Sequence, residues 1–245
     1  MKKLLTLFLV LIVQFGVFAD TLPDWFIPLR DSVYEQKLST ADIEKLAKDI
    51  EKKSRIQFTG FALDTALSRI EYFKGRAYQN DKKNSDAVKH YNECINLSEK
   101  SIKVQPTSSA YELIAASTME LCKIKDKPWV MARRPDIQKN SELALSLNGG
   151  SGSALYMIKS RWIFSTGTFA DISRGISELT DLLNSNNSLQ KDDFFNINLT
   201  IGYAYLLLKK KSEAEPWLKK AAEYYPTNQY VKDLLEDKIN LARDS

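Results

Sequence analysis

Apolar residues recur every three or four positions along nearly the whole chain after residue 23, and strict alternation of apolar and polar residues is almost absent. This spacing places the apolar side chains on one face of a helix, so it indicates helices rather than strands. The predicted helices cover residues 24–36, 41–53, 60–79, 84–104, 108–123, 135–147, 153–165, 171–184, 193–210, 213–224 and 227–242. The pattern therefore predicts an all-α protein.

Short polar motifs predict where several of these helices begin. Ser212 and Glu215 have the spacing of a capping box, in which a hydroxyl and a carboxylate each bond a free amide at the helix start. Ser109 and Glu112 have the same spacing. The segment 125–135 lacks the helical period and is predicted to be an expanded loop.

Two parts of the chain share one order of residue types. Toward the end of the chain, residues separated by 3, 9, 4, 3 and 5 positions are Gly202, Tyr205, Ala214, Leu218, Ala221 and Pro226. Earlier, residues separated by 3, 9, 4 and 3 positions are Gly75, Tyr78, Ala87, Tyr91 and Cys94. Small residues suit the contact between the two helices of a hairpin, and large apolar residues fill the gap to the next hairpin.

These are the positions of the tetratricopeptide repeat pattern, and the chain resembles that family. Two weaker units lie between the two clear ones, at steps of 40, 44 and 43 residues, against about 34 in the family. The resemblance implies a solenoid of helical hairpins with about four irregular repeats over residues 59–226. Residues 20–58 and 227–245 are predicted to be capping helices that cover the end faces.

Long repeats with insertions are also similar to the periplasmic repeat component associated with TRAP transporters. Members of that group are typically lipoproteins, and no Cys follows the first apolar run of this chain to accept a lipid.

The resemblance implies that ligands contact first-helix positions facing a concave groove. Transferred one by one, the candidate ligand-binding residues are Arg69, Tyr72, Arg76, Gln79, Glu112, Met119, Tyr156, Phe164, Asn196 and Tyr203. Arg69, Tyr72 and Arg76 share a helix face and would suit a carboxylate, because guanidinium binds it through two hydrogen bonds. We expect Arg76 to be exposed and to contribute little to folding. The alternatives are an ordinary solvated face and, for the apolar positions, packing against neighbouring helices.

The first residues have the composition of a secretory leader. Lys2 and Lys3 precede an apolar run from Leu4 to Phe18, and small residues stand at the positions read by a signal peptidase. Cleavage after Ala19 predicts an exported protein, periplasmic or secreted. The alternative is a retained membrane anchor, although the run is short for a span of about 20 residues.

Charge and candidate chemistry narrow the functional classes. Removal of the leader lowers the net charge from +4 to +2, which argues against nucleic acid as the partner. The single histidine, His90, is predicted to be a solvated surface residue, and no cluster has metal-ligand spacing. Cys94 and Cys122 are interpreted as two buried thiols, with a disulfide as the alternative. No catalytic residues, metal or cofactor are therefore predicted.

The function predicted from these features is non-catalytic binding of a peptide, a protein partner or a small amphipathic acid in the groove. Contact with a membrane would occur only through a partner. One alternative is a small-molecule-binding accessory of a transporter. Others are an enzyme with a helical-toroid active site and a structural assembly factor of the cell envelope.

Overall fold

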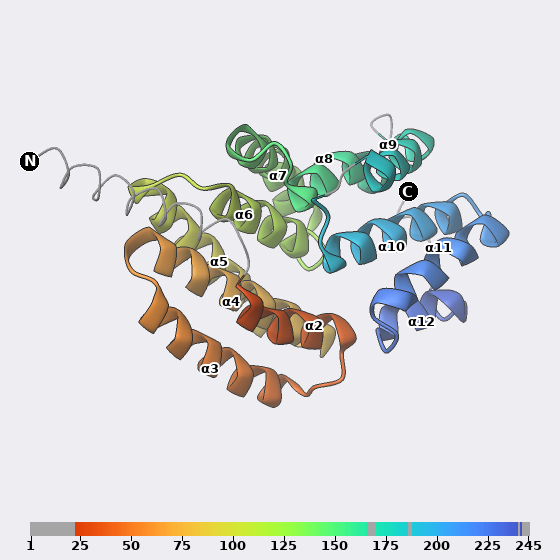
Figure 1. Ribbon diagram of the computed structural model, residues 1–245. Helices are drawn as coiled ribbons and strands as arrows, with labels where there is room; N and C mark the ends of the chain where they lie inside the picture. Colours follow the sequence, from red (N-terminus) through yellow and green to blue (C-terminus); the bar gives the residue numbers. More distant parts are fainter. Residues whose placement is uncertain (1–22, 166–169, 186–187, 240, 242–245) are drawn as a thin grey trace, which may run out of the picture. The chain divides into compact units, whose positions relative to one another are not determined.

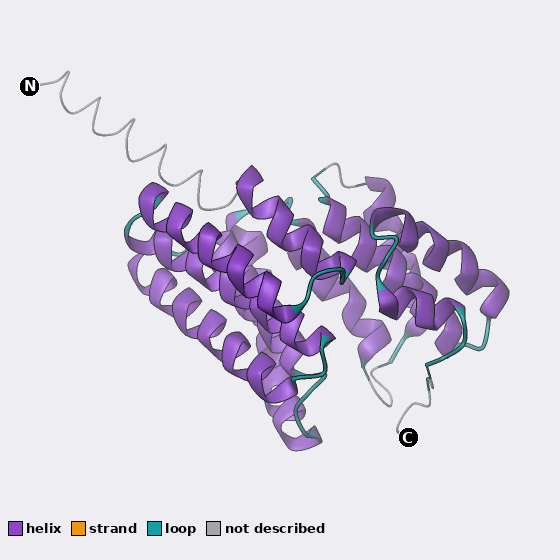
Figure 2. Cartoon of the chain, turned by 90° about the horizontal axis from the view of Figure 1, so that it is seen from below, coloured by secondary structure: helices purple, strands orange, loops and turns teal. Residues whose placement is uncertain are grey.

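The computed structural model describes residues 23–165, 170–185, 188–239 and 241 of the 245-residue chain. Within them every regular element is a helix, which confirms the predicted all-α class (Figure 2). The predicted leader, residues 1–19, lies outside the described residues. The chain divides into two compact units, one of Met1–Val33 and Leu38–Asn148 and the other of Tyr34–Lys37 and Gly149–Ser245.

The first unit is built from antiparallel helical hairpins. It contains the 3-10 turn η1 (Asp24–Phe26), most of α2 (Ile27–Glu35), and α3 (Thr40–Gln57), α4 (Gly60–Asn80), α5 (Asn84–Val104), α6 (Ser108–Leu121) and α7 (Lys127–Leu147). Helix α4 packs against α5 and α6 against α7, while α3 covers α4 (Figure 1). One core cluster joins Ala87 and Tyr91 of α5 to Leu121 of α6.

The second unit repeats the hairpin arrangement. It contains α8 (Gly152–Phe164), α9 (Ile172–Ser185), α10 (Lys191–Leu207), α11 (Lys211–Tyr224) and the short α12 (Gln229–Leu235). Helix α8 packs against α9 and α10 against α11, with α12 packed on α11. Ala214, Leu218 and Leu234 form its core cluster, so α12 contributes directly to the apolar interior. The predicted last helix, 227–242, is shorter in the structure.

The predicted loop at 125–135 is wrong, because α7 begins at Lys127 and runs through it. The side chain of Asp126 accepts a hydrogen bond from the Trp129 amide at 3.2 Å, which caps the helix start. Pro128 stands in the first turn, where an absent N–H costs little. Pro135 lies inside the helix and is exposed, so its ring is accommodated at the surface.

Both predicted capping boxes are also wrong. Helix α11 begins at Lys211, so Ser212 lies inside its first turn and its hydroxyl bonds the carboxylate of Glu213 at 2.6 Å. At α6 the cap is Thr107, whose side chain accepts from the Ala110 amide. Within the described residues, no helix combines the length and apolarity needed to cross a membrane.

Candidate functional site

The first hairpin with the repeated pattern is closed by a glycine and a tyrosine. Gly75 on α4 faces Tyr91 on α5, and a Cβ atom added at Gly75 would lie 2.6 Å from the ring Cε1 atom. The Tyr91 ring is fully buried, and its hydroxyl donates to Gln79 Oε1 at 2.5 Å. Only glycine therefore lets the two helices approach this closely.

The equivalent contact in the second unit joins Gly202 on α10 to Leu218 on α11. A Cβ atom at Gly202 would lie 2.7 Å from both Leu218 Cδ2 and Cγ. Leu218 is almost fully buried beside Ala214. The two hairpins thus share one close approach, filled by an aromatic ring in one unit and an aliphatic side chain in the other.

The predicted basic residues on α4 bond to groups of the same unit. Arg69 Nη2 donates to Ser109 Oγ at 3.0 Å, and Arg76 Nη1 donates to Tyr72 Oη at 3.2 Å. Arg76 Nη1 also lies 3.5 Å from the carboxylate of Glu120. The Arg76 side chain is only 16% exposed, so the expectation that it is exposed is wrong, and its small contribution to folding stays a prediction.

Glu120 is a buried anion on α6. Burial alone would raise its pKa, but the cations Lys123 and Arg76 outweigh this effect and hold the pKa below its ordinary value. Lys123 Nζ lies 2.9 Å from the Glu120 carboxylate. A buried charge must be paired, so Arg76 has a structural partner before any ligand arrives.

The remaining first-unit candidates also have internal contacts. The side chain of Glu112 accepts from Ser108 at 2.9 Å, and Met119 is half-buried on α6. The proposed carboxylate site on α4 remains a prediction. The structure adds that Arg76 already faces one carboxylate of its own unit.

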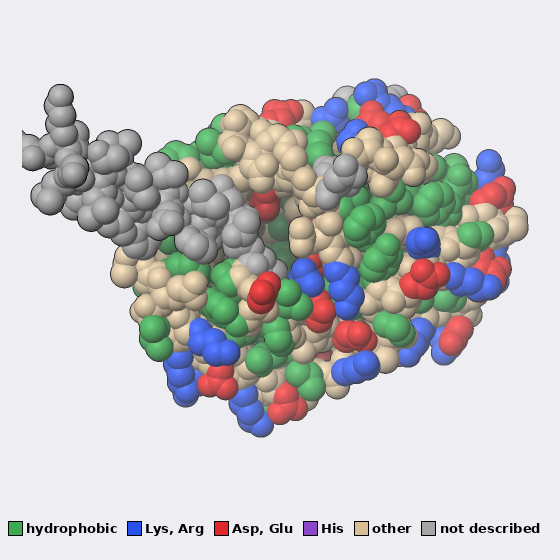
Figure 3. Space-filling model, viewed as in Figure 1, with side chains coloured by type: hydrophobic (Ala, Val, Ile, Leu, Met, Phe, Trp, Pro, Cys, Tyr) green, Lys and Arg blue, Asp and Glu red, His purple; other side chains and the backbone are tan. Residues whose placement is uncertain are grey.

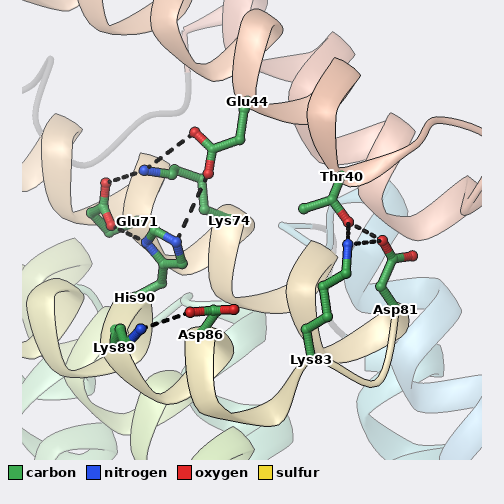
Figure 4. Close-up of polar contacts among 9 residues, drawn as sticks. All are labelled: Thr40, Glu44, Glu71, Lys74, Asp81, Lys83, Asp86, Lys89 and His90. Carbon is green, nitrogen blue, oxygen red and sulfur yellow. Dashed lines mark hydrogen bonds and ion pairs between the residues drawn. The ribbon is translucent and has the colours of Figure 1, made fainter.

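His90 is not the solvated surface residue that the sequence predicts. Its ring is 19% exposed, its Nδ1 lies 2.6 Å from Glu71 Oε2, and it stacks on Tyr78 with ring centroids 4.9 Å apart. Figure 4 shows His90 between the carboxylates of Glu71 and Glu44, with Lys74 bonded to both. These contacts join α3, α4 and α5.

Neighbouring polar and charged groups stabilise the ionised form of Glu71 in this cluster. Burial alone would raise the pKa of Glu71, but its hydrogen bond to His90 and the charge of Lys74 lower it below the ordinary value. Nearby, Lys83 bonds Thr40 and Asp81, which links the starts of α3 and α5 (Figure 4). Among the described residues, no group of three or more His, Cys, Asp or Glu could hold a metal ion.

The sequence analysis interprets both cysteines as buried thiols, and the structure confirms this for one of the two. Cys94 and Cys122 are both free; Cys94 is fully buried and Cys122 is half-buried. Cys94 lies in a polar seam of the core, where Ser68 Oγ donates to the Cys94 carbonyl at 2.8 Å and lies 2.5 Å from Ser98 Oγ. Burial raises the pKa of the Cys94 thiol to about 11.

The predicted residues of the second unit gather into an aromatic group. The Tyr156 hydroxyl lies 2.9 Å from Thr200 Oγ1, so this ring is anchored between α8 and α10. Phe164 is 41% exposed, and its ring centroid lies 6.0 Å from that of the half-buried Tyr203. Tyr230 on α12 of the same unit is 40% exposed, and partial burial and the phenols of Tyr203 and Tyr156 raise its pKa.

Asn196 stands apart from this group. Its side-chain amide donates to the hydroxyl of Tyr34 at 3.0 Å. Tyr34 belongs to the short segment Tyr34–Lys37 of the same unit. The position that the repeat resemblance selected for a ligand is therefore bonded to a residue of the chain itself.

Both hairpins match the tetratricopeptide repeat. The family model matches residues 69–101, within α4 and α5, and residues 195–228, which run from α10 to the turn before α12. These are the two hairpins closed by Gly75 and Gly202. No curated protein matches the chain.

The tetratricopeptide pattern selected Phe164 and Tyr203 but missed Tyr230 as a surface residue. Its spacing put Tyr230 on the apolar face of the last helix, with Val231 and Leu234, which are buried. Helix α12 is too short to hide Tyr230 as well. Sequence reasoning could have found it from its position at the first turn after Asn228, which caps α12.

Proposed function

We propose that the protein is a non-catalytic scaffold that binds a protein partner through the aromatic group Phe164, Tyr203 and Tyr230 of its second unit. Tetratricopeptide repeats generally mediate contacts between proteins, and two hairpins match that family. The observation that carries the proposal is the exposure of Phe164 beside Tyr203, together with the exposure of Tyr230 on α12 of the same unit.

The surface supports an apolar or aromatic partner segment. Hydrophobic side chains gather over the part of the second unit occupied by α9 and α10 (Figure 3). Exposed aromatic side chains close together are enriched at binding sites, because they bury a large area with few rotatable bonds. Tyr203 packs against the core cluster of this unit, as do its α10 neighbours Leu199 and Leu206.

We also propose that the protein acts after export. The support is the basic start at Lys2 and Lys3, the apolar run Leu4–Phe18 and the small residues Val17 and Ala19. N-terminal sequencing of the protein from cells should begin at Asp20. A sequence that begins at Met1, with the protein in the membrane fraction, would identify an anchor instead.

The binding proposal is tested by affinity capture from an envelope extract with four immobilised proteins. Wild type and Met131→Ala, which changes a residue 70% exposed on α7 of the first unit, should capture the same partner. Phe164→Ala and Tyr203→Ala should weaken its binding by at least about tenfold, as for central aromatic contacts in interfaces. Equal capture by all four would contradict the use of this surface.

The nature of the captured molecule distinguishes the narrower alternatives. A transporter subunit would support the transporter-accessory hypothesis. A co-purified organic acid whose binding depends on Arg69 would support the predicted carboxylate site on α4 instead.

A further inference from the structure

A second group of contacts in the second unit surrounds the segment Tyr34–Lys37. This four-residue segment belongs to the second unit, whereas the residues on both sides of it in the chain belong to the first. Tyr34 is only 3% exposed, although it lies in so short a segment. The segment is therefore held by residues distant in sequence.

Two aromatic rings, those of Tyr225 and Phe195, pack against the ring of Tyr34. Its ring stacks on Tyr225 with centroids 4.9 Å apart and planes 14° apart. Phe195 meets both rings edge-on, with centroids 5.4 Å from Tyr34 and 5.1 Å from Tyr225. The phenol oxygen accepts from the Asn196 amide at 3.0 Å, so the polar end of the ring is also recognised.

The main chain of the segment is recognised as well. Asn228 Nδ2 donates to the Tyr34 carbonyl at 2.7 Å, and Thr227 Oγ1 donates to the Glu35 carbonyl at 2.7 Å. The Gln229 amide donates to Gln36 Oε1 at 2.8 Å. Tyr34 and Glu35 are the last two residues of α2, so these donor side chains satisfy carbonyls that a helix end leaves without a partner in the helix.

The groups around Glu35 favour an acidic residue at the position after the tyrosine. The Glu35 carboxylate also accepts from Thr227 Oγ1. Burial alone would raise the pKa of Glu35, but the hydrogen bonds from Thr227 and Lys37 and the charges of Lys37 and Lys191 lower it. Lys191 Nζ lies 4.3 Å from the centre of the Tyr225 ring, so the cation stands beside these aromatic rings.

We propose that Phe195, Asn196, Tyr225, Thr227 and Asn228 form a recognition site for a tyrosine followed by an acidic residue, the Tyr-acid site. In the free protein the chain's own Tyr34 and Glu35 occupy it. A partner segment with the same two residues binds there by replacing them. This site is separate from the aromatic group of the proposed function and goes beyond that function.

The test supplies the segment as a separate peptide. A fluorescein-labelled peptide with the sequence of residues 31–38 is titrated, by fluorescence anisotropy, into full-length wild type and into Tyr34→Ala, whose own tyrosine is missing. The variant should bind the peptide at least about tenfold more tightly than wild type, because its site is not occupied. A peptide carrying alanine in place of the tyrosine should not bind either protein.

The hydrogen bond to the phenol provides a matched control. In the Tyr34→Ala background, a peptide with phenylalanine should bind about threefold to tenfold more weakly than one with tyrosine, the loss expected for one hydrogen bond. With Asn196→Ala added, this difference should disappear. The loss of the peptide's phenol oxygen and the Asn196→Ala change are coupled only if the peptide's ring lies beside Asn196, where Tyr34 lies in the structure.

Three results would overturn the proposal. The first is that the peptide fails to bind folded Tyr34→Ala even at about 1 mM, a concentration at which weak binding would be detected. It could bind wild type and variant equally, which places it elsewhere. Finally, if both Tyr34→Ala and the second opening variant, Glu35→Lys, fail to fold, the segment is part of the core. None of these results bears on Phe164, so the proposed scaffold function is tested independently.

Discussion

The hairpins α4–α5 and α10–α11 have the same close approach between their helices and different chemistry around it. Gly75 admits the ring of Tyr91, while Gly202 admits the side chain of Leu218. Around the first contact lie polar and ionic groups, such as Glu120 with Arg76 and His90 with Glu71. Aromatic and aliphatic side chains also pack around the first contact, and they surround the second.

This difference shows that the repeat specifies a backbone contact and leaves the surrounding chemistry open. The polar groups of the first hairpin are buried or half-buried and are paired with groups of the same unit. In the second hairpin the aromatic residues remain partly exposed or hold the segment at Tyr34. The second unit is therefore the better candidate for recognition.

The largest expected effect comes from filling the two glycine positions. Gly75→Leu should lower the free energy of unfolding by roughly 3 kcal/mol and Gly202→Leu by nearer to about 1 kcal/mol, within the range for overpacked cores. The Tyr91 ring is rigid and hydrogen-bonded, whereas the Leu218 side chain has no polar atom to fix its rotamer. Urea denaturation measures both losses.

A compensating change checks the cause. Adding Tyr91→Leu to Gly75→Ala should restore part of the stability lost by Gly75→Ala, because the shorter side chain leaves room for the new Cβ. Equal losses at Gly75 and Gly202, or none at Gly75, would mean that the two contacts do not differ as described.

The next effect concerns Glu120, the buried anion that Arg76 of the first hairpin contacts. Arg76→Ala should lower the free energy of unfolding by about 1–3 kcal/mol, because Glu120 loses a cation while it stays buried. Arg133→Ala, which removes an exposed ion pair with Asp136, should cost at most about 0.5 kcal/mol. Adding Glu120→Gln to Arg76→Ala should recover part of the loss. Similar values for both arginines would contradict a structural role for Arg76.

The His90 cluster predicts a smaller effect that depends on pH. The pKa of Glu71 in the folded protein lies below its ordinary value, so its ionised form stabilises the fold above the ordinary pKa. This contribution is lost as the pH falls through the lowered pKa. Urea midpoints measured from pH 7 to pH 3 should therefore decline less steeply for Glu71→Gln than for wild type. Parallel declines would show that Glu71 does not contribute.

The smallest effect is on the reactivity of the cysteine thiols, which reports the unfolding of the first unit alone. Both cysteines of the chain lie in the first unit. Cys122, half-buried, should react with a maleimide in the native protein, whereas buried Cys94, with a pKa of about 11, should react only when the unit opens. Labelling of Cys94 along a urea titration then reports the first unit alone. Rapid native labelling of Cys94 in a Cys122→Ser variant would contradict its burial.

The sequence by itself determined the helical class and the phase of both clear repeats. Apolar spacing depends only on the helix period, and the pairs Gly75–Tyr91 and Gly202–Leu218 have the spacing of touching helices. The predicted helix 135–147 covers only the later part of α7, although Asp126 and Pro128 are strong local signals of an earlier helix start.

Only the tertiary structure decided which polar and aromatic residues are free to bind. Arg76 meets Glu120 across 44 positions of sequence, and Tyr34 meets Asn196 across 162 positions. No local pattern specifies such pairs, because each helix face can meet any other face that packing brings to it. His90 changes from an expected surface residue to a buried partner of Glu71 for the same reason. Exposure is a property of the assembled hairpins, and the period of one helix does not determine it.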